Sequence, residues 1–404
     1  MRQKLSLFLA FCLATAATAG WINVRPNFNY VYKDVFFVNQ DTGWVVGLGG
    51  KAMRTYNGGA SWSNFNSGLS SQDNIFAVCF INDSTGLIAG EGGKIYRTVN
   101  RGNRWTAVTS PAGWYIDFRR IYFLNADTGF ICGTGGVMLK TINGGTSWTQ
   151  VGSLTNPLWD ISFIGSLKGW TAGYQGASYK TTDGGAIWSF ASYIGGEVYA
   201  IHMINENIGL AACGSGVNAY IKRTENGGTS WTELDNIDGK RFFFLSASRG
   251  YLASGSSSHP MMTIDSGRTW HEQIGDSGSI SSVFFLNNSV GYAVGSVTIL
   301  KTTDGGGNIA VEKAFARSSS FDFNVVPNPL PGRAVAAYVL AQETDVSLEV
   351  FDTRGVKIIS VASGHQTPGA YQVPFTMPAS SKGVYFCRLT RDRMFVTKKV
   401  VLVR

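Results

Sequence analysis

The chain has 404 residues, of which 50 are glycines, 13% are aromatic and only 15% are charged. This composition is typical of many tight turns around an apolar β core. The formal net charge of +8 does not indicate nucleic-acid binding, because residues 1–20 carry +2 and residues 321–404 carry +4, which leaves +2 for residues 21–320. A central region this close to neutral lacks the broad basic surface that holds phosphate backbones, so we expect no nucleic-acid partner.

Residues 1–19 have the pattern of a secretory signal peptide. Arg2 and Lys4 form a charged start, residues 5–13 are apolar, and residues 17–19 read Ala-Thr-Ala, a small-residue cleavage site. The apolar run is too short to span a membrane, and no other stretch is long and apolar enough. We therefore expect a chain that is exported through the periplasm and has no transmembrane segment once the signal is removed.

An eight-residue unit recurs along the chain and is seen most clearly at residues 141–148, Thr-Ile-Asn-Gly-Gly-Thr-Ser-Trp. Further copies occupy residues 55–62, 98–105, 181–188, 224–231 and 263–270, and a seventh begins at Thr302 but lacks its tryptophan. The six tryptophans are 43, 43, 40, 43 and 39 residues apart. Repeats of about 40–45 residues are typical of propeller blades with four short strands.

Each unit predicts a turn that is held by one side chain. An Asn or Asp accepts hydrogen bonds from backbone N–H groups that follow it, glycine supplies the positive φ of the reversal, and the Trp packs the turn onto the core. The predicted turn-holding residues are Asn57, Asn100, Asn143, Asp183, Asn226, Asp265 and Asp304. The second unit departs from the pattern, because Arg104 stands where Ser or Thr normally does.

The rest of each repeat predicts three more strands. An apolar strand such as residues 35–39 comes first, and its continuous hydrophobicity indicates burial on both faces. A second strand bracketed by glycine follows, as in residues 43–47, and a third leads into the turn, as in residues 137–141. The fourth strand begins at the Trp.

The two ends of the repeat region predict how the ring closes. The seventh repeat lacks a Trp-led fourth strand, whereas the segment from Gly20 to Val24 matches such a strand. We therefore predict an all-β, seven-bladed β-propeller over residues 20–307, with the N-terminal strand completing the last blade.

A different module is predicted after a linker at residues 308–320. Residues 321–404 contain short alternating strands separated by glycine turns, which indicates a small C-terminal β-sandwich.

The repeated turn resembles the Asp-box of sialidase-type (BNR) propellers and, more closely, its variant in propellers similar to photosystem II assembly factors (YCF48-like). That resemblance implies docking of a protein partner through an arginine-bearing face. Arg119, Arg120 and Arg241 match the idea by blade position only. A photosynthetic role is not implied, because the C-terminal module indicates a different biology.

The C-terminal module resembles the type A sorting domain of the type IX secretion system. The motifs that carry this resemblance are Pro-Asn-Pro at residues 327–329, Gly383-Val384-Tyr385 and Lys-Lys-Val-Val-Leu at residues 398–402. The resemblance implies recognition by the type IX secretion machinery, export to the outer-membrane surface or the medium of a Bacteroidetes-like bacterium, and removal of the domain in many members. An ordinary adhesive sandwich is the alternative.

Candidate binding residues come from the positions just before each predicted inner strand, which propeller geometry places at one mouth of the central channel. They are Lys33-Asp34, Phe76-Ala77, Arg119-Arg120, Trp159-Asp160, Tyr199-Ala200, Lys240-Arg241 and Ser281-Ser282, with Trp114 from a neighbouring loop. From this set the strongest candidates are Asp34, Trp114, Arg119, Arg120, Trp159, Asp160, Tyr199, Lys240 and Arg241. Cations beside aromatics suit a protein or a glycan ligand. The alternative is that half of these side chains pack under neighbouring loops.

These features favour a non-enzymatic, monomeric binding module, and a secreted glycan hydrolase or lyase is the alternative. Glycosidases need two suitably spaced carboxylates, for which Asp34 and Asp160 are the candidates. Phe118-Arg119-Arg120 only partly matches the arginine segment of sialidases. The four histidines have no metal-site spacing, and we expect neither a metal nor a cofactor.

Overall fold

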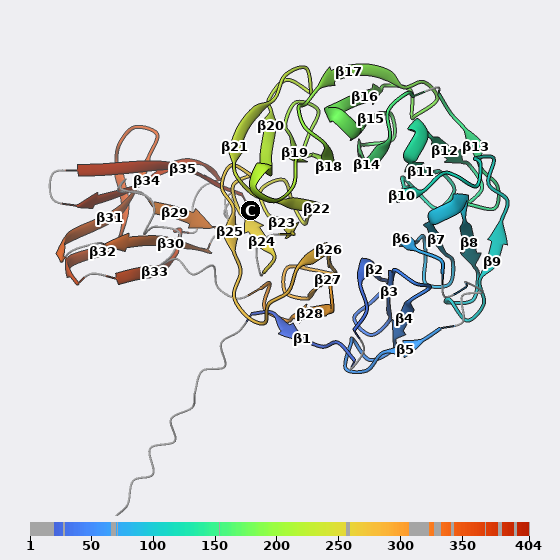
Figure 1. The fold of residues 1–404 in the computed structure, drawn as a ribbon. Coiled ribbons are helices and arrows are strands. Elements are labelled where there is room, and N and C mark those ends of the chain that lie inside the picture. Colours follow the sequence, from blue (N-terminus) through green and yellow to red (C-terminus); the bar gives the residue numbers. More distant parts are fainter. Residues whose placement is uncertain are drawn as a thin grey trace, which may run out of the picture. The chain divides into compact units, whose positions relative to one another are not determined.

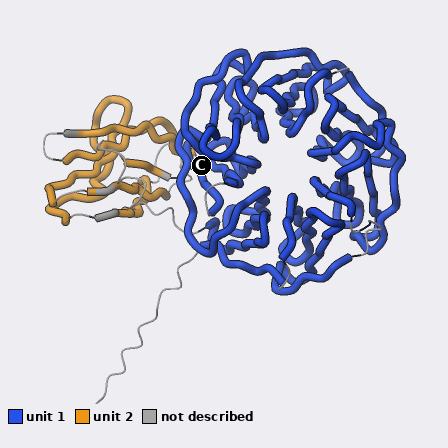
Figure 2. The backbone as a smooth tube through the Cα atoms, viewed as in Figure 1, with its two compact units in different colours: residues 1–308 blue, residues 309–404 orange. Residues whose placement is uncertain are grey.

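The computed structural model consists of two compact units, residues 1–308 and 309–404, coloured separately in Figure 2. The structure describes residues 20–306 apart from 27–28, 66–69, 71, 153 and 256–258, and residues 323–403 apart from 327–332, 341–342, 368, 379–381 and 392–393. The predicted signal peptide and the predicted linker lie outside the described residues. No helix in the described part of the chain is long and apolar enough to cross a membrane.

The described strands of the first unit form seven four-stranded antiparallel sheets, which are the blades of a propeller (Figure 1). Blade one contains β2 (Tyr32–Phe37), β3 (Gly43–Gly47), β4 (Ala52–Thr55) and β5 (Ser63–Asn64). Blade two contains β6 (Ile75–Phe80), β7 (Gly86–Gly90), β8 (Ile95–Thr98) and β9 (Thr106–Val108). Blade three contains β10 (Phe118–Phe123), β11 (Gly129–Gly133), β12 (Met138–Thr141) and β13 (Thr149–Gln150). Blade four contains β14 (Leu158–Ile164), β15 (Lys168–Gly173), β16 (Ala177–Thr181) and β17 (Ser189–Tyr193). Blade five contains β18 (Val198–Met203), β19 (Gly209–Cys213), β20 (Tyr220–Thr224) and β21 (Thr232–Asp235). Blade six contains β22 (Gly239–Phe244), β23 (Gly250–Ser254), β24 (Met261–Thr263) and β25 (His271–Glu272). Blade seven contains β26 (Ile280–Phe285), β27 (Gly291–Gly295), β28 (Thr298–Thr302) and β1 (Ile22–Asn23).

The helical content of the described residues is limited to four three-residue 3-10 turns between second and third strands. These are η1 (Glu91–Gly93), η2 (Thr134–Gly136), η3 (Tyr174–Gly176) and η4 (Gly216–Asn218).

The innermost strands follow one another around the centre of the ring (Figure 1). Each contacts the innermost strand of the next blade, and β26 of the last blade contacts β2 of the first. The N-terminal strand completes the last blade as predicted, since β1 pairs with β28 through Ile22–Lys301 and Asn23–Leu300. Trp21, just before β1, is 1% exposed and meets Phe285 edge-to-face, with 5.7 Å between the ring centroids.

Aromatic packing between blades explains the glycines of the second strands. Phe37 near the end of β2 stacks on Tyr292 of blade seven, with the ring centroids 3.6 Å apart. A Cβ on Gly43 would lie 2.4 Å from the Phe37 ring, and a Cβ on Gly291 would lie equally close to Phe285. In six blades the glycine at this position is therefore required by the phenylalanine ring that packs beside it, and in blade five Gly209 lies beside Met203.

The repeated turn has a regular hydrogen-bond pattern. In blade three, Ser147 N donates to Asn143 Oδ1 at 3.0 Å, and Gly145 N donates to Thr141 Oγ1 at 3.0 Å. In all seven turns the side-chain Oδ1 of the Asn or Asp accepts at least one backbone N–H that follows it. These residues are thus occupied in holding turns.

Cationic side chains of third strands link neighbouring blades, which the sequence pattern did not suggest. Each reaches a backbone carbonyl in the turn of the adjacent blade. The bonds run from Arg97 Nε to Gly144 O at 2.8 Å, Lys140 Nζ to Gly184 O at 2.8 Å, Arg223 Nη1 to Ser266 O at 2.6 Å and Lys301 Nζ to Gly58 O at 2.7 Å.

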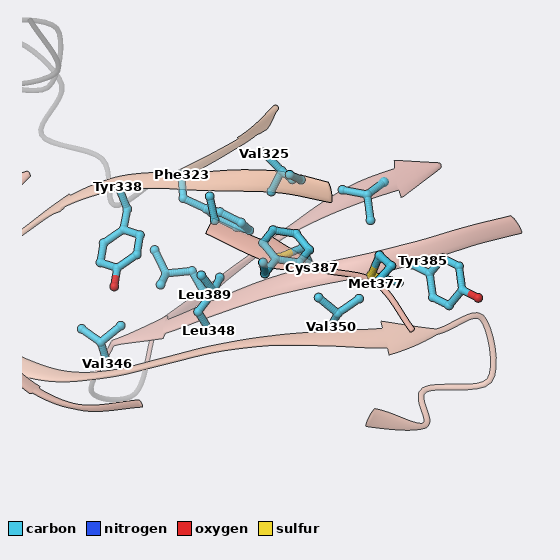
Figure 3. Close-up of a cluster of buried hydrophobic side chains, with 14 of the residues drawn as sticks. Phe323, Val325, Tyr338, Val346, Leu348, Val350, Met377, Tyr385, Cys387 and Leu389 are labelled. Atoms are coloured by element: carbon cyan, nitrogen blue, oxygen red, sulfur yellow. The ribbon is translucent and has the colours of Figure 1, made fainter. Parts of the chain in front are cut away.

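The second unit contains two sheets that contribute to one apolar core. The first is β29 (Phe323–Val326), β30 (Arg333–Leu340) and β33 (Gly369–Thr376), and the second is β32 (Lys357–Gln366), β31 (Thr344–Asp352), β34 (Gly383–Arg391) and β35 (Met394–Leu402). Phe323 and Tyr338 from the first sheet and Leu348 and Leu389 from the second belong to the same buried cluster (Figure 3).

Candidate functional site

The seven innermost strands share a β-bulge at their start. The pairing register shifts between the first and third residue of each strand, for example between Tyr32 and Asp34 in β2 and between Phe118 and Arg120 in β10. The same shift occurs in β6, β14, β18, β22 and β26. The candidate pairs were expected just before the inner strands, and the structure places them inside the strands. A bulge adds an unpaired residue that redirects a side chain, which a periodic sequence pattern does not reveal.

The bulges define two sets of positions, which we call the mouth ring and the ion-pair ring. The mouth ring consists of the second residues, which are all half-buried: Lys33, Phe76, Arg119, Trp159, Tyr199, Lys240 and Ser281. The ion-pair ring consists of the third residues: Asp34, Ala77, Arg120, Asp160, Ala200, Arg241 and Ser282.

Arg119 is held between two aromatic rings of the mouth ring. Its guanidinium carbon lies 4.3 Å from the centroid of Phe76 and 5.2 Å from that of Trp159. Its Nη2 also pairs with Asp117 Oδ2 at 3.0 Å. Contacts from both neighbouring blades therefore restrict where this charge can move.

Glu197 connects the next part of the mouth ring. Its two carboxylate oxygens accept hydrogen bonds from Trp159 Nε1 and the Tyr199 hydroxyl, each at 3.0 Å. Lys240 lies over the Tyr199 ring, 4.4 Å from its centroid, and pairs with Asp238. The aromatic side chains of the mouth ring are thus oriented by polar partners.

Lys33 differs from the other two mouth-ring cations. It has no ion pair or hydrogen bond with any residue that the structure describes. Burial lowers the pKa of Lys33, and the nearby charges of Arg119 and Lys240 lower it further. Since these residues come from blades one, three and six, three cations converge here and one of them lacks a counter-charge.

Asp34 of the ion-pair ring binds groups from four blades. Its carboxylate pairs with Arg241 Nη2 at 3.2 Å and accepts bonds from Ser282 Oγ at 2.8 Å, Val78 N at 3.1 Å and Val35 N at 3.0 Å. The side chain is 1% exposed. Asp34 therefore joins blades one, two, six and seven.

Asp160 has the same role on the other side of the ring. Its Oδ1 lies 3.1 Å from Arg120 Nε, and its carboxylate accepts bonds from Ile161 N at 3.0 Å and Ile201 N at 3.1 Å. Burial raises the pKa of both Asp34 and Asp160, and the charge of Arg120 opposes that rise in each. Arg120 and Arg241 were expected to present charge to a ligand. In the structure Arg120 pairs with Asp160 and Arg241 pairs with Asp34.

Trp114 lies on the connection between β9 and β10 and is 83% exposed. Its ring contacts Tyr115 edge-to-face, with centroids 6.1 Å apart. These two side chains form an exposed aromatic pair on the connection that leads into β10.

We expect His202, in β18, to make the stability of the protein depend on pH. Its ring stacks on Phe244 with centroids 4.6 Å apart, and burial together with the Arg120 charge lowers its pKa from 6.5 to about 4. The unfolded chain therefore binds a proton before the folded one does, so stability is lost as pH falls from 6.5 towards 4, by about 3 kcal/mol in total. His202→Phe should remove this loss, measured as the unfolding free energy in urea from pH 7 to pH 4.

The raised pKa values of Asp34 and Asp160 act in the opposite direction, because each binds its proton more readily in the folded chain. The contribution of His202 is therefore the difference between the pH profiles of the unfolding free energy of wild type and His202→Phe. Neither profile gives that contribution by itself, because each also contains the effect of the two aspartates. Parallel pH profiles for wild type and variant would contradict the assignment.

Part of the repeat region is similar in sequence to a known protein family. Residues 13–112 and 66–157 match the family described as photosynthesis system II assembly factor YCF48. The solved structure of YCF48 bound to D1 peptide is 18% identical and covers 72% of this chain and 99% of that chain with a TM-score of 0.59. The propeller is YCF48-like. No curated protein sequence matches the chain.

Two further solved structures resemble the chain over most of its length. PorZ, a surface component of the type IX secretion system of Porphyromonas gingivalis, is 13% identical, with coverage of 94% of this chain and 61% of that chain and a TM-score of 0.51. The GH74 enzyme of Niastella koreensis is 14% identical, with coverage of 96% and 75% and a TM-score of 0.56. At these identities the likeness establishes the fold of the YCF48-like propeller and nothing about its ligand.

Sequence reasoning missed the acidic partners of the mouth ring. Asp117, Glu197 and Asp238 each precede a mouth-ring residue by two positions and contact it. These partners could have been found from the sequence, because an acidic residue stands two positions before each of these candidate binding residues.

Proposed function

We propose that the YCF48-like propeller is a secreted or surface-displayed, non-enzymatic binding module that holds an acidic segment of a protein ligand at its channel mouth. The observation that carries the proposal is Lys33, which has no counter-charge among the described residues and lies where the charges of Arg119 and Lys240 act on it. A carboxylate in the ligand supplies the missing charge, and the oriented aromatics beside it supply apolar contact. YCF48 itself has been solved bound to a D1 peptide, so a peptide ligand is compatible with this fold.

Peptide binding tests the mouth ring directly. Fluorescein-labelled hexaglutamate should bind the purified chain, and Lys33→Gln should weaken that binding about tenfold, since hydrogen bonds to charged groups contribute about 1.5–3 kcal/mol. The readout is fluorescence anisotropy at fixed ionic strength. Lys168→Gln is the matched control, because Lys168 begins β15 at the end of its blade away from the bulge.

Equal affinities for wild type and Lys33→Gln would contradict the proposal. Tighter binding of a neutral oligosaccharide than of hexaglutamate would also contradict it and would favour a glycan as the ligand, for which the exposed Trp114 is the natural contact.

A secreted glycan hydrolase is the second candidate function, and the similarity of fold to a GH74 enzyme favours it. Against it, the candidate carboxylates Asp34 and Asp160 are 1% and 5% exposed and hold interblade hydrogen bonds. Release of reducing sugar from xyloglucan by the purified chain, lost in Asp160→Asn, would favour the enzyme.

We also propose that residues 321–404 are a type IX sorting domain and that residues 1–19 are a signal peptide. The sorting motifs of the sequence support the first assignment, and likeness of fold to PorZ is compatible with a surface location.

Removing residues 321–404 should leave a folded propeller that stays in the periplasm. Each unit has its own buried clusters among the described residues, so the propeller does not need the second core. Fractionation of cells of a Bacteroidetes host with an intact type IX system, together with the melting temperature of the truncated chain, checks both parts. Truncated protein at the cell surface would show that export uses another signal.

A further inference from the structure

A cavity of about 710 Å³ lies at the outer edge of blade two, away from the mouth ring. One wall is formed by residues 106–109, which include the outermost strand β9, and the other is the turn of blade three, with Thr146, Ser147 and Trp148. Arg97 and Arg104 also line it, and none of its lining residues is acidic. The volume falls within the range of about 300–1,000 Å³ that is typical of ligand sites.

The blade-two turn departs from the other turns where it faces this cavity. Arg104 is exposed, and its guanidinium has no partner among the described residues, while the equivalents are Ser61, Ser147, Ile187, Ser230 and Thr269. Three residues earlier, Arg101 has a φ of 61°, at a position that is glycine in five of the other six turns. A side chain in this left-handed region costs about 1 kcal/mol or more, and Ser266 in the turn of blade six has a similar φ of 63°. Arg101 does not line the cavity, whereas Arg104 does.

The other wall offers main-chain hydrogen bonds. Among the described strands β9 pairs only with β8, through Thr106–Arg97, Ala107–Tyr96 and Val108–Ile95. Its second edge therefore has no strand partner among the described strands, and its residues line the cavity. An exposed strand edge of this kind takes an additional strand from a partner.

We propose that this groove binds an extended acidic peptide, which adds to β9 as a fifth strand of blade two and places a carboxylate against Arg104. Arg97 is held by its bond to Gly144 O at 2.8 Å and adds a second fixed positive charge to the same groove. A peptide fits better than a glycan, because the aromatic side chain in the lining, Trp148, is 6% exposed and offers no open face for a sugar ring. This site is independent of the ligand proposed at the channel mouth.

The test uses full-length protein that carries Lys33→Gln, so that the mouth ring contributes little. A fluorescein-labelled peptide Glu-Val-Glu-Val-Glu-Val should bind, and Arg104→Ser should weaken binding about tenfold, since it removes a charge-assisted hydrogen bond. Arg104→Ser introduces the residue that three of the other turns have at this position, so its melting temperature should not fall. Arg268→Ser, at a 60% exposed arginine in the turn of blade six, is the control and should leave the affinity unchanged.

A second probe separates strand addition from simple charge attraction. The same peptide with alternate amides N-methylated keeps every carboxylate but loses main-chain donors, and the proposal expects its binding to fall at least tenfold in one of the two methylation registers. Equal binding of the methylated and unmethylated peptides, no effect of Arg104→Ser, or preference for tetragalacturonate over the peptide would each overturn the proposal.

Discussion

Deleting residues 20–25 should lower the melting temperature of the protein by about 10 °C. The deletion removes β1 and with it the pairing with β28, and it exposes a strand edge at the point where the ring closes. It also removes Trp21, which is 1% exposed, and loss of a buried aromatic side chain costs about 3–5 kcal/mol. Differential scanning calorimetry of the deleted and intact chains measures the change.

A pair of single substitutions separates burial from simple shortening of the chain. Trp21→Ala should account for much of the loss, whereas Ile22→Ala in the same strand should have little effect, since Ile22 is 53% exposed. If the deleted chain melts like the intact one, β1 does not close the ring in solution.

Asp34→Ala should destabilise the propeller by about 3 kcal/mol, more than removal of any exposed ion-pair partner. The substitution leaves the half-buried Arg241 without its carboxylate and removes the acceptor for Ser282 Oγ and Val78 N. Urea unfolding followed by tryptophan fluorescence measures the free energy. Glu206→Ala is the matched control, because Glu206 also pairs with a cation but is 56% exposed, and such pairs contribute about 0–1 kcal/mol.

The double variant Asp34→Ala/Arg241→Leu tests the physical reason. Because it removes the buried charge together with its partner, it should be more stable than Asp34→Ala alone. If the double variant is less stable than Asp34→Ala, the cost lies in lost packing and not in an uncompensated charge.

The candidate site was only partly predictable from the sequence. The equivalent positions of the seven repeats predicted which side chains lie near one another, because propeller symmetry brings equivalent positions to one end of the channel. Their roles could not be predicted in the same way. Arg241 and Asp34 are 207 residues apart and meet only because blade six lies two places from blade one in the ring. That Lys33 is the mouth-ring cation without an ion pair to any described residue became apparent only from the partners of its neighbours.

By itself, the sequence determined the repeat, the turns and the ring closure of this protein. These features depend on local chemistry, since a turn needs its Asn or Asp and its glycines within a few residues, and a period of about 43 residues reports one blade. Only the tertiary structure decided which charges are structural and which face solvent. The adjacent residues Lys33 and Asp34 differ in burial, because the bulge in β2 leaves Lys33 half-buried in the mouth ring and buries Asp34 among four blades. A charge's role depends on what surrounds it in space, and those surroundings come from distant parts of the chain.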